Sequence, residues 1–317
     1  MAPATSQATS SAGTVASNLS SNLSTPLARN GYALIKGAIP AERIDALLDS
    51  LGRIKRSRRF RFRAQGTNSF EAPNLDGHGN LRNSIHNPHL LGALPGFQQK
   101  VEAIIFSEPL YRCLHDQAGE GVYVNWQTML FDRSVGTRNH QDSWYLDTDP
   151  PGGVIGAWIA LEDITMDCGP FKIYERTNRG RIDPGAYDFG DLENDRAFQC
   201  DHPEGRCVRL LPAKGDVILW DSLLVHGADM PASDVKTRKS LTAHFYRHGR
   251  AVQDQPIKRS FSIYDHRQPA TSRHKKILKA ATIHPLLYSG LCIGLSAIRS
   301  PELVGSGNAL TEIRTVN

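Results

Sequence analysis

Three side chains that can ligate a metal ion stand in two short segments of the sequence. The first segment is the triplet His140, Gln141 and Asp142. If this triplet lies on a strand, alternate side chains share a face, so His140 and Asp142 can hold one ion together. An isolated H-x-D triplet is weak evidence, because such triplets arise by chance and neither side chain needs a metal.

The third candidate, His226, follows a strongly apolar run that begins at Val217 and includes Trp220. A histidine at the end of such a strand can be a buried core residue or a metal ligand. Two imidazoles and one carboxylate leave one side of an ion open, and this ligand set is associated with non-haem iron(II) oxygenases. Zinc more often takes thiolates or a third histidine, so the set His140, Asp142 and His226 favours Fe(2+).

Arg238 begins a run in which a period of two places Arg238, Ser240 and Thr242 on one face of a strand. The alternate face is apolar and carries Leu241, Ala243 and Phe245. An arginine on an inward face needs an anion, and the distal carboxylate of a dicarboxylic cosubstrate would accept a bidentate, charge-assisted pair from it. Ser240 would hold the same carboxylate. The alternative for Arg238 is a surface ion pair.

The strand expected near residues 122–131 indicates a pocket beside these groups. Its odd positions are mostly polar and would line that pocket: Tyr123, Asn125, Gln127 and Met129. Its even positions are largely apolar and would pack outside it: Val122, Val124, Trp126 and Leu130. A polar inner face is typical of a cavity rather than a dry core, so Gln127 and Met129 join the candidate cosubstrate contacts.

The elements that must position these residues change character along the chain. Spacings of three and four predict a helix over Ile44–Ile54, after a strand at Tyr32–Ile35. A second helix is expected from Phe97 to Phe106, stopped by Pro109, with polar loops over 63–94. From Gly121 the period becomes two, and short strands predict a mainly β fold with flanking helices, a jelly roll or barrel. Strands are expected near 122–131, 138–146, 154–164, 171–174, 207–210, 216–220, 223–226 and 238–247.

Composition and charge describe an ordinary globular protein of 317 residues with a formal net charge of +5. Much of the positive charge lies between Arg53 and Arg63. We interpret this run as a solvated helix end; the alternatives are a rim that attracts an anionic substrate and, more remotely, a nucleic-acid surface. Five scattered cysteines indicate a reducing compartment, and the grouping of Cys200, His202 and Cys207 matches no common zinc spacing.

The two ends of the sequence differ from its middle. Residues 1–26 are rich in Ser, Thr, Ala and Asn and predict a disordered tail without a targeting signal. The rest, 27–317, is expected to form one domain with helical N-terminal and C-terminal additions. The apolar stretch 286–298 is too short to span a bilayer and predicts a packed helix. We expect a cytoplasmic protein whose partner is a small-molecule substrate rather than a membrane or nucleic acid.

Between Leu27 and Gly249 the sequence resembles the phytanoyl-CoA dioxygenase family of iron(II)- and 2-oxoglutarate-dependent oxygenases. The motifs that carry the resemblance are T-M-L, H-Q-D, A-W-x-A-L-E-D, a C-G-P turn, a strand ending in H-G, and R-K-S. The resemblance implies a cupin-like double-stranded β-helix, with His140, Asp142 and His226 as catalytic iron ligands. It implies that Arg238 anchors 2-oxoglutarate, and that Met129, Gln141 and Trp158 line the cosubstrate pocket.

The same resemblance implies that O2 and 2-oxoglutarate are consumed and that succinate and carbon dioxide are released. Hydroxylation of a small metabolite, such as one of secondary metabolism, is the favoured reaction, and desaturation, ring formation and epimerisation stay open because they use the same three ligands. Trp144 and Tyr145 are candidates for the substrate side, or else aromatic core residues. The sequence departs from the family pattern in the loop from Tyr174 to Asn178, and this departure leaves the substrate open. Two other functions stay open: a metal-binding jelly roll that acts as a sensor or scaffold, and a nucleic-acid demethylase.

Overall fold

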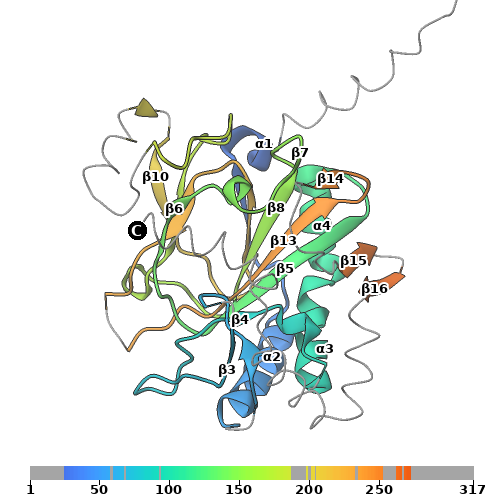
Figure 1. Ribbon diagram of the computed structural model, residues 1–317, viewed down its shortest axis with the longest axis vertical. Coiled ribbons are helices and arrows are strands. Elements are labelled where there is room, and N and C mark those ends of the chain that lie inside the picture. Colours follow the sequence, from blue (N-terminus) through green and yellow to red (C-terminus); the bar gives the residue numbers. More distant parts are fainter. Residues whose placement is uncertain are drawn as a thin grey trace, which may run out of the picture.

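Two antiparallel sheets and a layer of helices make up most of the described chain (Figure 1). The structure is a computed structural model, and it describes residues 25–57, 60–67, 69–92, 94–186, 198, 201–203, 205–232 and 235–252, together with the backbone of 262–265 and 268–272. The larger sheet has the strand order β1-β11-β8-β13-β5-β15-β16, and β4 also pairs with β5. Its strands are β1 (Tyr32–Ile35), β4 (Ile85–His86), β5 (Tyr123–Phe131), β8 (Val154–Ala160), β11 (Val217–Asp221), β13 (Ser240–Arg247), β15 (Ser262–Asp265) and β16 (Gln268–Ser272).

The smaller sheet has the order β10-β9-β12-β6. Its strands are β6 (Thr137–His140), β9 (Phe171–Tyr174), β10 (Cys207–Leu210) and β12 (His226–Ala228). Two short pairs lie outside both sheets: β2 (Phe62–Arg63) with β3 (Phe70–Glu71), and β7 (Thr148–Asp149) with β14 (Ala251–Val252). Trp158 and Trp220 of the larger sheet pack with Phe171 and Ile173 of the smaller one. The two sheets therefore face each other, as the predicted jelly roll requires.

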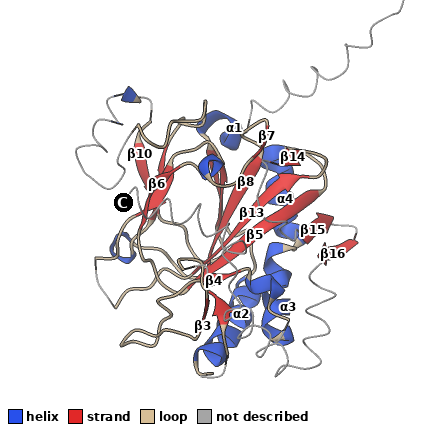
Figure 2. Cartoon of the chain, viewed as in Figure 1, coloured by secondary structure: helices blue, strands red, loops and turns tan. Residues whose placement is uncertain are grey.

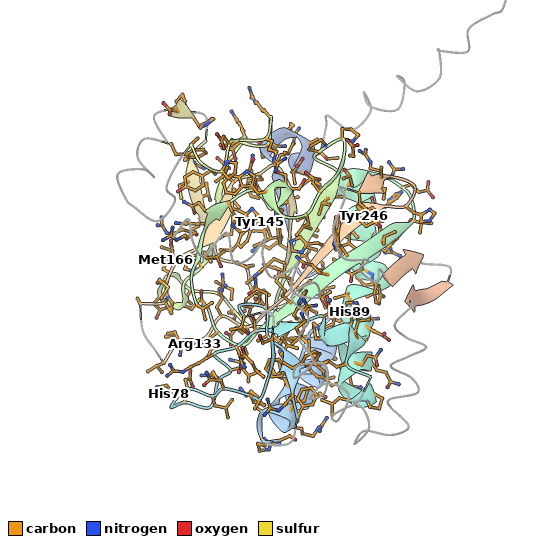
Figure 3. All side chains as sticks on the ribbon, viewed as in Figure 1. His78, His89, Arg133, Tyr145, Met166 and Tyr246 are labelled. Atoms are coloured by element: carbon orange, nitrogen blue, oxygen red, sulfur yellow. The ribbon has the colours of Figure 1, made fainter. Side chains whose placement is uncertain are left out.

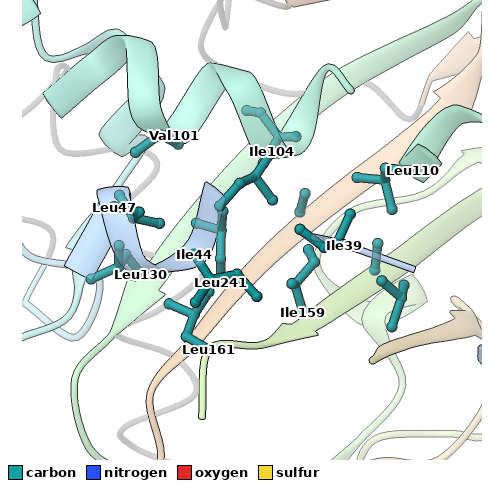
Figure 4. Packing of buried hydrophobic residues seen from close by; sticks show 14 of the residues in the cluster. Ile39, Ile44, Leu47, Val101, Ile104, Leu110, Leu130, Ile159, Leu161 and Leu241 are labelled. Atoms are coloured by element: carbon teal, nitrogen blue, oxygen red, sulfur yellow. The ribbon is translucent and has the colours of Figure 1, made fainter. Parts of the chain in front are cut away.

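Helices cover the other face of the larger sheet, as Figure 2 shows. They are α1 (Pro26–Asn30), α2 (Ala41–Lys55), α3 (Pro95–Ile105) and α4 (Glu108–Ala118). The connecting segments also contain the 3-10 turns η2 (Pro88–Leu90), η3 (Asp142–Trp144) and η4 (Met166–Cys168). Leu47 of α2 and Ile104 of α3 meet Ile159 and Leu241 of the sheet in one buried core (Figure 4). Alternation along β8 and β13 thus sends one set of side chains to the helices and the other to the space between the sheets.

Several element boundaries differ from the sequence prediction. The helix expected to stop before Pro109 does end at Ile105, but a further helix, α4, begins at once. Ser107 caps it, and Pro109 occupies its first turn, where a missing N–H removes no hydrogen bond. The strand predicted over 138–146 ends at His140, because η3 follows it. The 63–94 segment is not entirely loop: β4 lies in it and adds to the larger sheet.

A bulge in β5 corrects the predicted alternation along that strand. His244 pairs with Gln127 while the next residue, Phe245, pairs with Asn125, so Trp126 is the extra residue. Gln127 and Met129 keep the predicted face, opposite His244 and Thr242 of β13. In the part of β5 before the bulge, each side chain lies on the face opposite to the predicted one.

Tyr123, which was expected to line the pocket, packs in the helix-side core. Asn125 lies opposite Phe245, which belongs to the same core. Trp126 and Val124, which were expected outside, pack with Tyr246 and Leu146 instead. The prediction of a pocket face is therefore wrong for Tyr123 and Asn125.

Some predictions fall outside the described residues, namely the tail before residue 25, the apolar stretch 286–298, Cys200, and Arg58 and Arg59 of the basic run. Within the described part of that run, Lys55 ends α2 and forms a 2.5 Å ion pair with the buried Asp132. Among the described helices, none is both long enough and apolar enough to cross a bilayer.

Candidate metal centre

His140, Asp142 and His226 converge between the two sheets. Each offers one ligand atom, and these atoms lie within 4.8 Å of one another. Asp142 Oδ1 is 3.5 Å from His140 Nε2 and 3.7 Å from His226 Nε2. In the described part of the chain, no other cluster of three His, Cys, Asp or Glu side chains has this geometry. The predicted convergence of the three residues is therefore present.

The backbone achieves this convergence differently from the prediction. His140 and His226 are partners across the β6–β12 pair, so the two rings stand side by side with centroids 4.3 Å apart. Asp142 does not share the strand face of His140, because the strand has already ended and η3 begins at Asp142. The 3-10 turn, rather than strand alternation, directs the carboxylate toward the histidines.

Both imidazoles are oriented by their own chain. His140 Nδ1 lies 2.9 Å from the carbonyl oxygen of Arg138, and His226 Nδ1 lies 2.9 Å from that of Leu224. A carbonyl only accepts, so each Nδ1 carries the hydrogen and each Nε2 presents a lone pair toward Asp142. A neutral imidazole with a free Nε2 is the form that binds a metal ion.

The charges of the cluster also suit a cation. Burial alone would raise the pKa of Asp142, but the neighbouring His244 and His226 hold that pKa well below its usual value. Burial, and then the neighbouring His140, lower the pKa of His226 to about 4. At neutral pH the cluster therefore consists of an ionised carboxylate and a neutral His226.

Arg238 supplies the second half of the predicted site. Its side chain is 3% exposed, and its Nε and Nη1 atoms have no hydrogen-bond partner among the residues that the structure describes. Its guanidinium carbon lies 5.9 Å from the ring centre of Trp158. The hydroxyl of Ser240, two positions along the chain, is also buried and has no hydrogen-bond partner in the described part of the chain. Burial lowers the pKa of Arg238 to about 10, which still leaves it charged at neutral pH. A buried cation and hydroxyl without partners match a carboxylate ligand.

A row of aromatic rings connects Arg238 to the three-residue cluster. The Trp158 ring, beneath Arg238, lies 6.2 Å from the ring of Phe171, and Phe171 stacks on His226 at 5.5 Å. The partly buried Met129 lies across from Thr242, which pairs in turn with Trp158. The structure thus brings the predicted carboxylate anchor and the predicted metal ligands to one region between the sheets.

The amide of Gln141 is engaged by the chain itself. Its Nε2 donates to the carbonyl oxygens of Gly180 and Leu223, the first at 2.9 Å, and its Oε1 accepts from the Ile182 N–H at 2.8 Å. These contacts hold the 180–182 loop beside the cluster. The expected contact between Gln141 and a cosubstrate stays a prediction.

Trp144 and Tyr145 lie just past Asp142, as the sequence requires, and both are partly exposed. The indole N–H of Trp144 donates to the Ile182 carbonyl at 2.8 Å, which fixes this ring to the 180–182 loop. The ring of Tyr145, labelled in Figure 3, lies 5.8 Å from that of His140. Burial and the charge of Asp142 raise the pKa of Tyr145 to about 12, so its hydroxyl stays protonated.

Two residues at the cluster were missed by the sequence reasoning. The indole N–H of Trp220 donates to Asp142 Oδ2 at 2.8 Å, and His244 Nε2 lies 3.2 Å from the same oxygen. His244 has the same parity as Ser240 on β13, so alternation could have found it. Nothing in the sequence shows that Trp220 reaches the carboxylate.

Curated relatives match parts of the chain. Peroxisomal phytanoyl-CoA dioxygenase of Mus musculus is 26% identical over 155 residues, which cover 48% of this chain and 44% of the mouse protein. The Homo sapiens protein of the same name is 28% identical over 109 residues, which cover 33% of this chain and 32% of the human protein. The matched segments thus span less than half of these relatives.

Solved structures share the fold at low identity. The carbocyclase SnoK from nogalamycin biosynthesis superposes with a TM-score of 0.54 at 14% identity, covering 75% of this chain and 94% of its own. EctD from S. alaskensis with bound Fe gives 0.52 at 18% identity, covering 70% and 74%. The family model for phytanoyl-CoA dioxygenase (PhyH) matches residues 27–240. The chain therefore belongs to the phytanoyl-CoA dioxygenase family.

Proposed function

We propose that this protein is an iron(II)- and 2-oxoglutarate-dependent dioxygenase that hydroxylates a small organic metabolite. The observation that carries the proposal is that a candidate metal site and a candidate carboxylate site lie in the same region between the sheets. One is the His140, Asp142 and His226 cluster, whose ligand atoms lie within 4.8 Å of one another. The other is the buried Arg238, two of whose nitrogens have no hydrogen-bond partner among the described residues. Family membership supports the same activity.

His140, Asp142 and His226 fit Fe(2+) by their chemistry. Two neutral nitrogen donors and one carboxylate oxygen would occupy one side of the ion and leave the other side open to the cosubstrate and O2. The carboxylate also neutralises part of the charge of the cation in a region with little water. When bound, iron and 2-oxoglutarate supply the oxidising power, with succinate and carbon dioxide as products.

Arg238 and Ser240 fit the distal carboxylate of 2-oxoglutarate. The guanidinium offers N–H donors in a planar fork, and the Ser240 hydroxyl adds another donor. Both are buried, so an anion that binds them is shielded from water and held strongly. Met129, Gln127 and Trp158 lie on the strands that pair with β13, and they would line the cosubstrate site and exclude water from it.

The substrate would bind beyond Tyr145, next to His140. Tyr145 keeps its proton at neutral pH and can donate a hydrogen bond to a polar group of a small molecule. Trp144, held against the 180–182 loop, would form an adjoining apolar wall. The cytoplasmic location stays a prediction.

A succinate assay tests the proposed activity. The purified protein is incubated with Fe(2+), 2-oxoglutarate, ascorbate and a panel of small metabolites, and succinate and product masses are measured. We expect succinate formation that requires both iron and 2-oxoglutarate, and we expect Asp142→Ala to abolish it. Iron-independent turnover, or full activity of Asp142→Ala, would reject the assignment.

The same preparation separates the enzyme from the sensor or scaffold alternative. Isothermal titration measures 2-oxoglutarate binding to the metal-loaded protein and to Arg238→Gln. Binding that depends on Arg238, without succinate release for any member of the panel, would favour a non-catalytic protein. A steep salt dependence of DNA or RNA binding would favour the nucleic-acid alternative instead.

A further inference from the structure

The two oxygens of Asp142 have different surroundings. Oδ1 faces the imidazole nitrogens of His140 and His226, at 3.5 and 3.7 Å. Oδ2 points away from them and accepts a 2.8 Å hydrogen bond from the indole N–H of Trp220. His244 Nε2 lies 3.2 Å from the same Oδ2. Trp220 and His244 are 1% and 2% exposed, so water does not compete for this oxygen.

Gln127 gives His244 the right tautomer for this contact. The Gln127 Nε2 group lies 3.4 Å from His244 Nδ1. An amide N–H can only donate, so Nδ1 accepts and the ring hydrogen resides on Nε2, which faces Asp142. Oδ2 therefore receives two N–H donors, one from β11 and one from β13.

Gly156 makes room for both donors. It lies on β8 between the two strands and is the backbone partner of Trp220 on one side and of His244 on the other. A Cβ at this position would lie 2.0 Å from Cε2 of Trp220, so any other residue would displace the indole. The two rings meet edge to face over this gap, with centroids 5.7 Å apart at an angle of 88°.

We propose that Trp220 and His244 are positioning residues that hold Asp142 Oδ2, so that the carboxylate presents only Oδ1 to the metal. The proposal rests on the proposed role of His140, Asp142 and His226 as ligands. An unrestrained carboxylate can turn and bind an ion through both oxygens. The second oxygen would then take a coordination position that the cosubstrate or O2 requires. Two fixed donors on Oδ2 prevent this change.

Cobalt binding to the metal-free protein tests the proposal without any turnover. Co(2+) is titrated into the wild type, Trp220→Phe and His244→Leu, and both affinity and the visible absorption spectrum are recorded. Each substitution removes one N–H donor, and we expect affinity to fall by roughly 10- to 100-fold, the usual effect of losing an outer hydrogen bond to a metal ligand. The cobalt spectrum should change as well, because the carboxylate can now bind through both oxygens.

Conservative and indirect variants separate positioning from a general loss of structure. His244→Gln keeps an N–H donor near the position of Nε2, so it should restore most of the affinity lost in His244→Leu. Gly156→Ala leaves the Trp220 N–H intact but displaces its ring, so it should resemble Trp220→Phe. Circular dichroism and the melting temperature identify any variant that fails to fold.

Matched controls remove the same groups elsewhere in the core. Trp126→Phe loses a buried indole N–H that packs with Tyr246, and His89→Leu loses a buried imidazole bonded to Thr128. Both should retain wild-type cobalt affinity. Wild-type affinity and spectrum in folded Trp220→Phe and His244→Leu would overturn the positioning role alone. A wild type whose cobalt binding survives Asp142→Ala would instead overturn the ligand assignment, and the positioning role with it.

Discussion

Arg238 is a buried cation whose Nε and Nη1 atoms lack hydrogen-bond partners in the described structure. Such a group destabilises the protein until an anion arrives, because its desolvation is not offset. We expect Arg238→Met, which keeps the length of the side chain, to raise the free energy of unfolding of the metal-free protein by about 1–3 kcal/mol. The same variant should lose 2-oxoglutarate binding. Urea unfolding and calorimetric titration measure the two effects.

Arg238→Lys is the matched control for Arg238→Met. Arg238→Lys keeps the charge but not the fork of donors, so it should gain no stability and should bind 2-oxoglutarate weakly. If Arg238→Met were markedly less stable than the wild type, the guanidinium would have a structural partner, and its assignment as a cosubstrate anchor would fail.

At the residue scale, the sequence was most informative where spacing alone determines geometry. Alternation predicts Arg238 and Ser240 on one face of a strand, and His244 follows the same rule, although β13 itself begins only at Ser240. Trp220 could not be assigned in this way, because its indole reaches Asp142 only through the space left by Gly156 on another strand. A contact that depends on an absent side chain elsewhere leaves no local pattern in the sequence.

At the scale of single elements, an aspartate lies at each end of β11, and the pKa of one is raised while the pKa of the other is lowered. Burial, and then the charges of Asp147 and Asp142, raise the pKa of Asp221 to about 6, although the Leu223 N–H opposes this change. Burial would also raise the pKa of Asp216, but Lys36 and two backbone N–H groups lower it below its ordinary value. The two carboxyls should therefore affect stability with opposite dependence on pH.

The signs follow from proton linkage. Folded Asp221 keeps its proton up to about pH 6, whereas the unfolded chain loses it near 3.8, so its contribution to stability falls as pH rises between these values. Asp221→Asn should match the wild type near pH 4 and exceed it at pH 7.5 by at most about 3 kcal/mol. Asp216→Asn should lose stability at pH 7.5 and little at low pH. Urea unfolding of the metal-free proteins from pH 4 to 8 measures both, and parallel curves for the two variants would contradict this account.

Helix α4 shows why one element was missed. Pro109 was interpreted as a stop for the preceding helix, yet proline also favours the first turn of a new one. The overlooked signal is Ser107, whose hydroxyl accepts from the Leu110 N–H at 3.3 Å. Serine followed closely by an acidic residue and proline is typical of a helix start, and it competes with the interpretation as a stop.

Ser107 therefore offers a direct measure of this cap. Ser107→Ala should lower the free energy of unfolding by about 1 kcal/mol, because the Leu110 N–H loses its acceptor. Cobalt affinity should not change, since α4 packs on the helix side of the larger sheet. Ser107→Asp, which restores an acceptor, should recover the loss. A Ser107→Ala protein as stable as the wild type would show that the cap contributes nothing.

At the scale of the whole molecule, the larger sheet separates two cores, one that packs against the helices and one that contacts the candidate metal ligands. The helix-side core, which includes Ile104, packs the larger sheet against α2 and α3. The core between the sheets includes Phe171, whose ring stacks on His226 at 5.5 Å and lies 5.2 Å from Trp220. Sequence periodicity predicted most strands of the two sheets and two of the packed helices, but not β4, β15 or β16. The contact between the inner core and the metal ligands could not be predicted from periodicity, because it depends on β9 and β11 facing each other in space.

Two conservative substitutions compare the cores. Ile104→Val removes one methylene group on the helix side and should cost about 0.5–1.5 kcal/mol, with cobalt and 2-oxoglutarate affinities unchanged. Phe171→Leu should cost about 1–3 kcal/mol, and it should also weaken cobalt binding, because the rings of His226 and Trp220 lose the surface that fixes them. Measuring unfolding and cobalt affinity for both variants separates stability from metal binding. Equal losses of cobalt affinity would mean that the site responds to global stability alone, and a loss confined to Phe171→Leu would locate its support in the layer between the sheets.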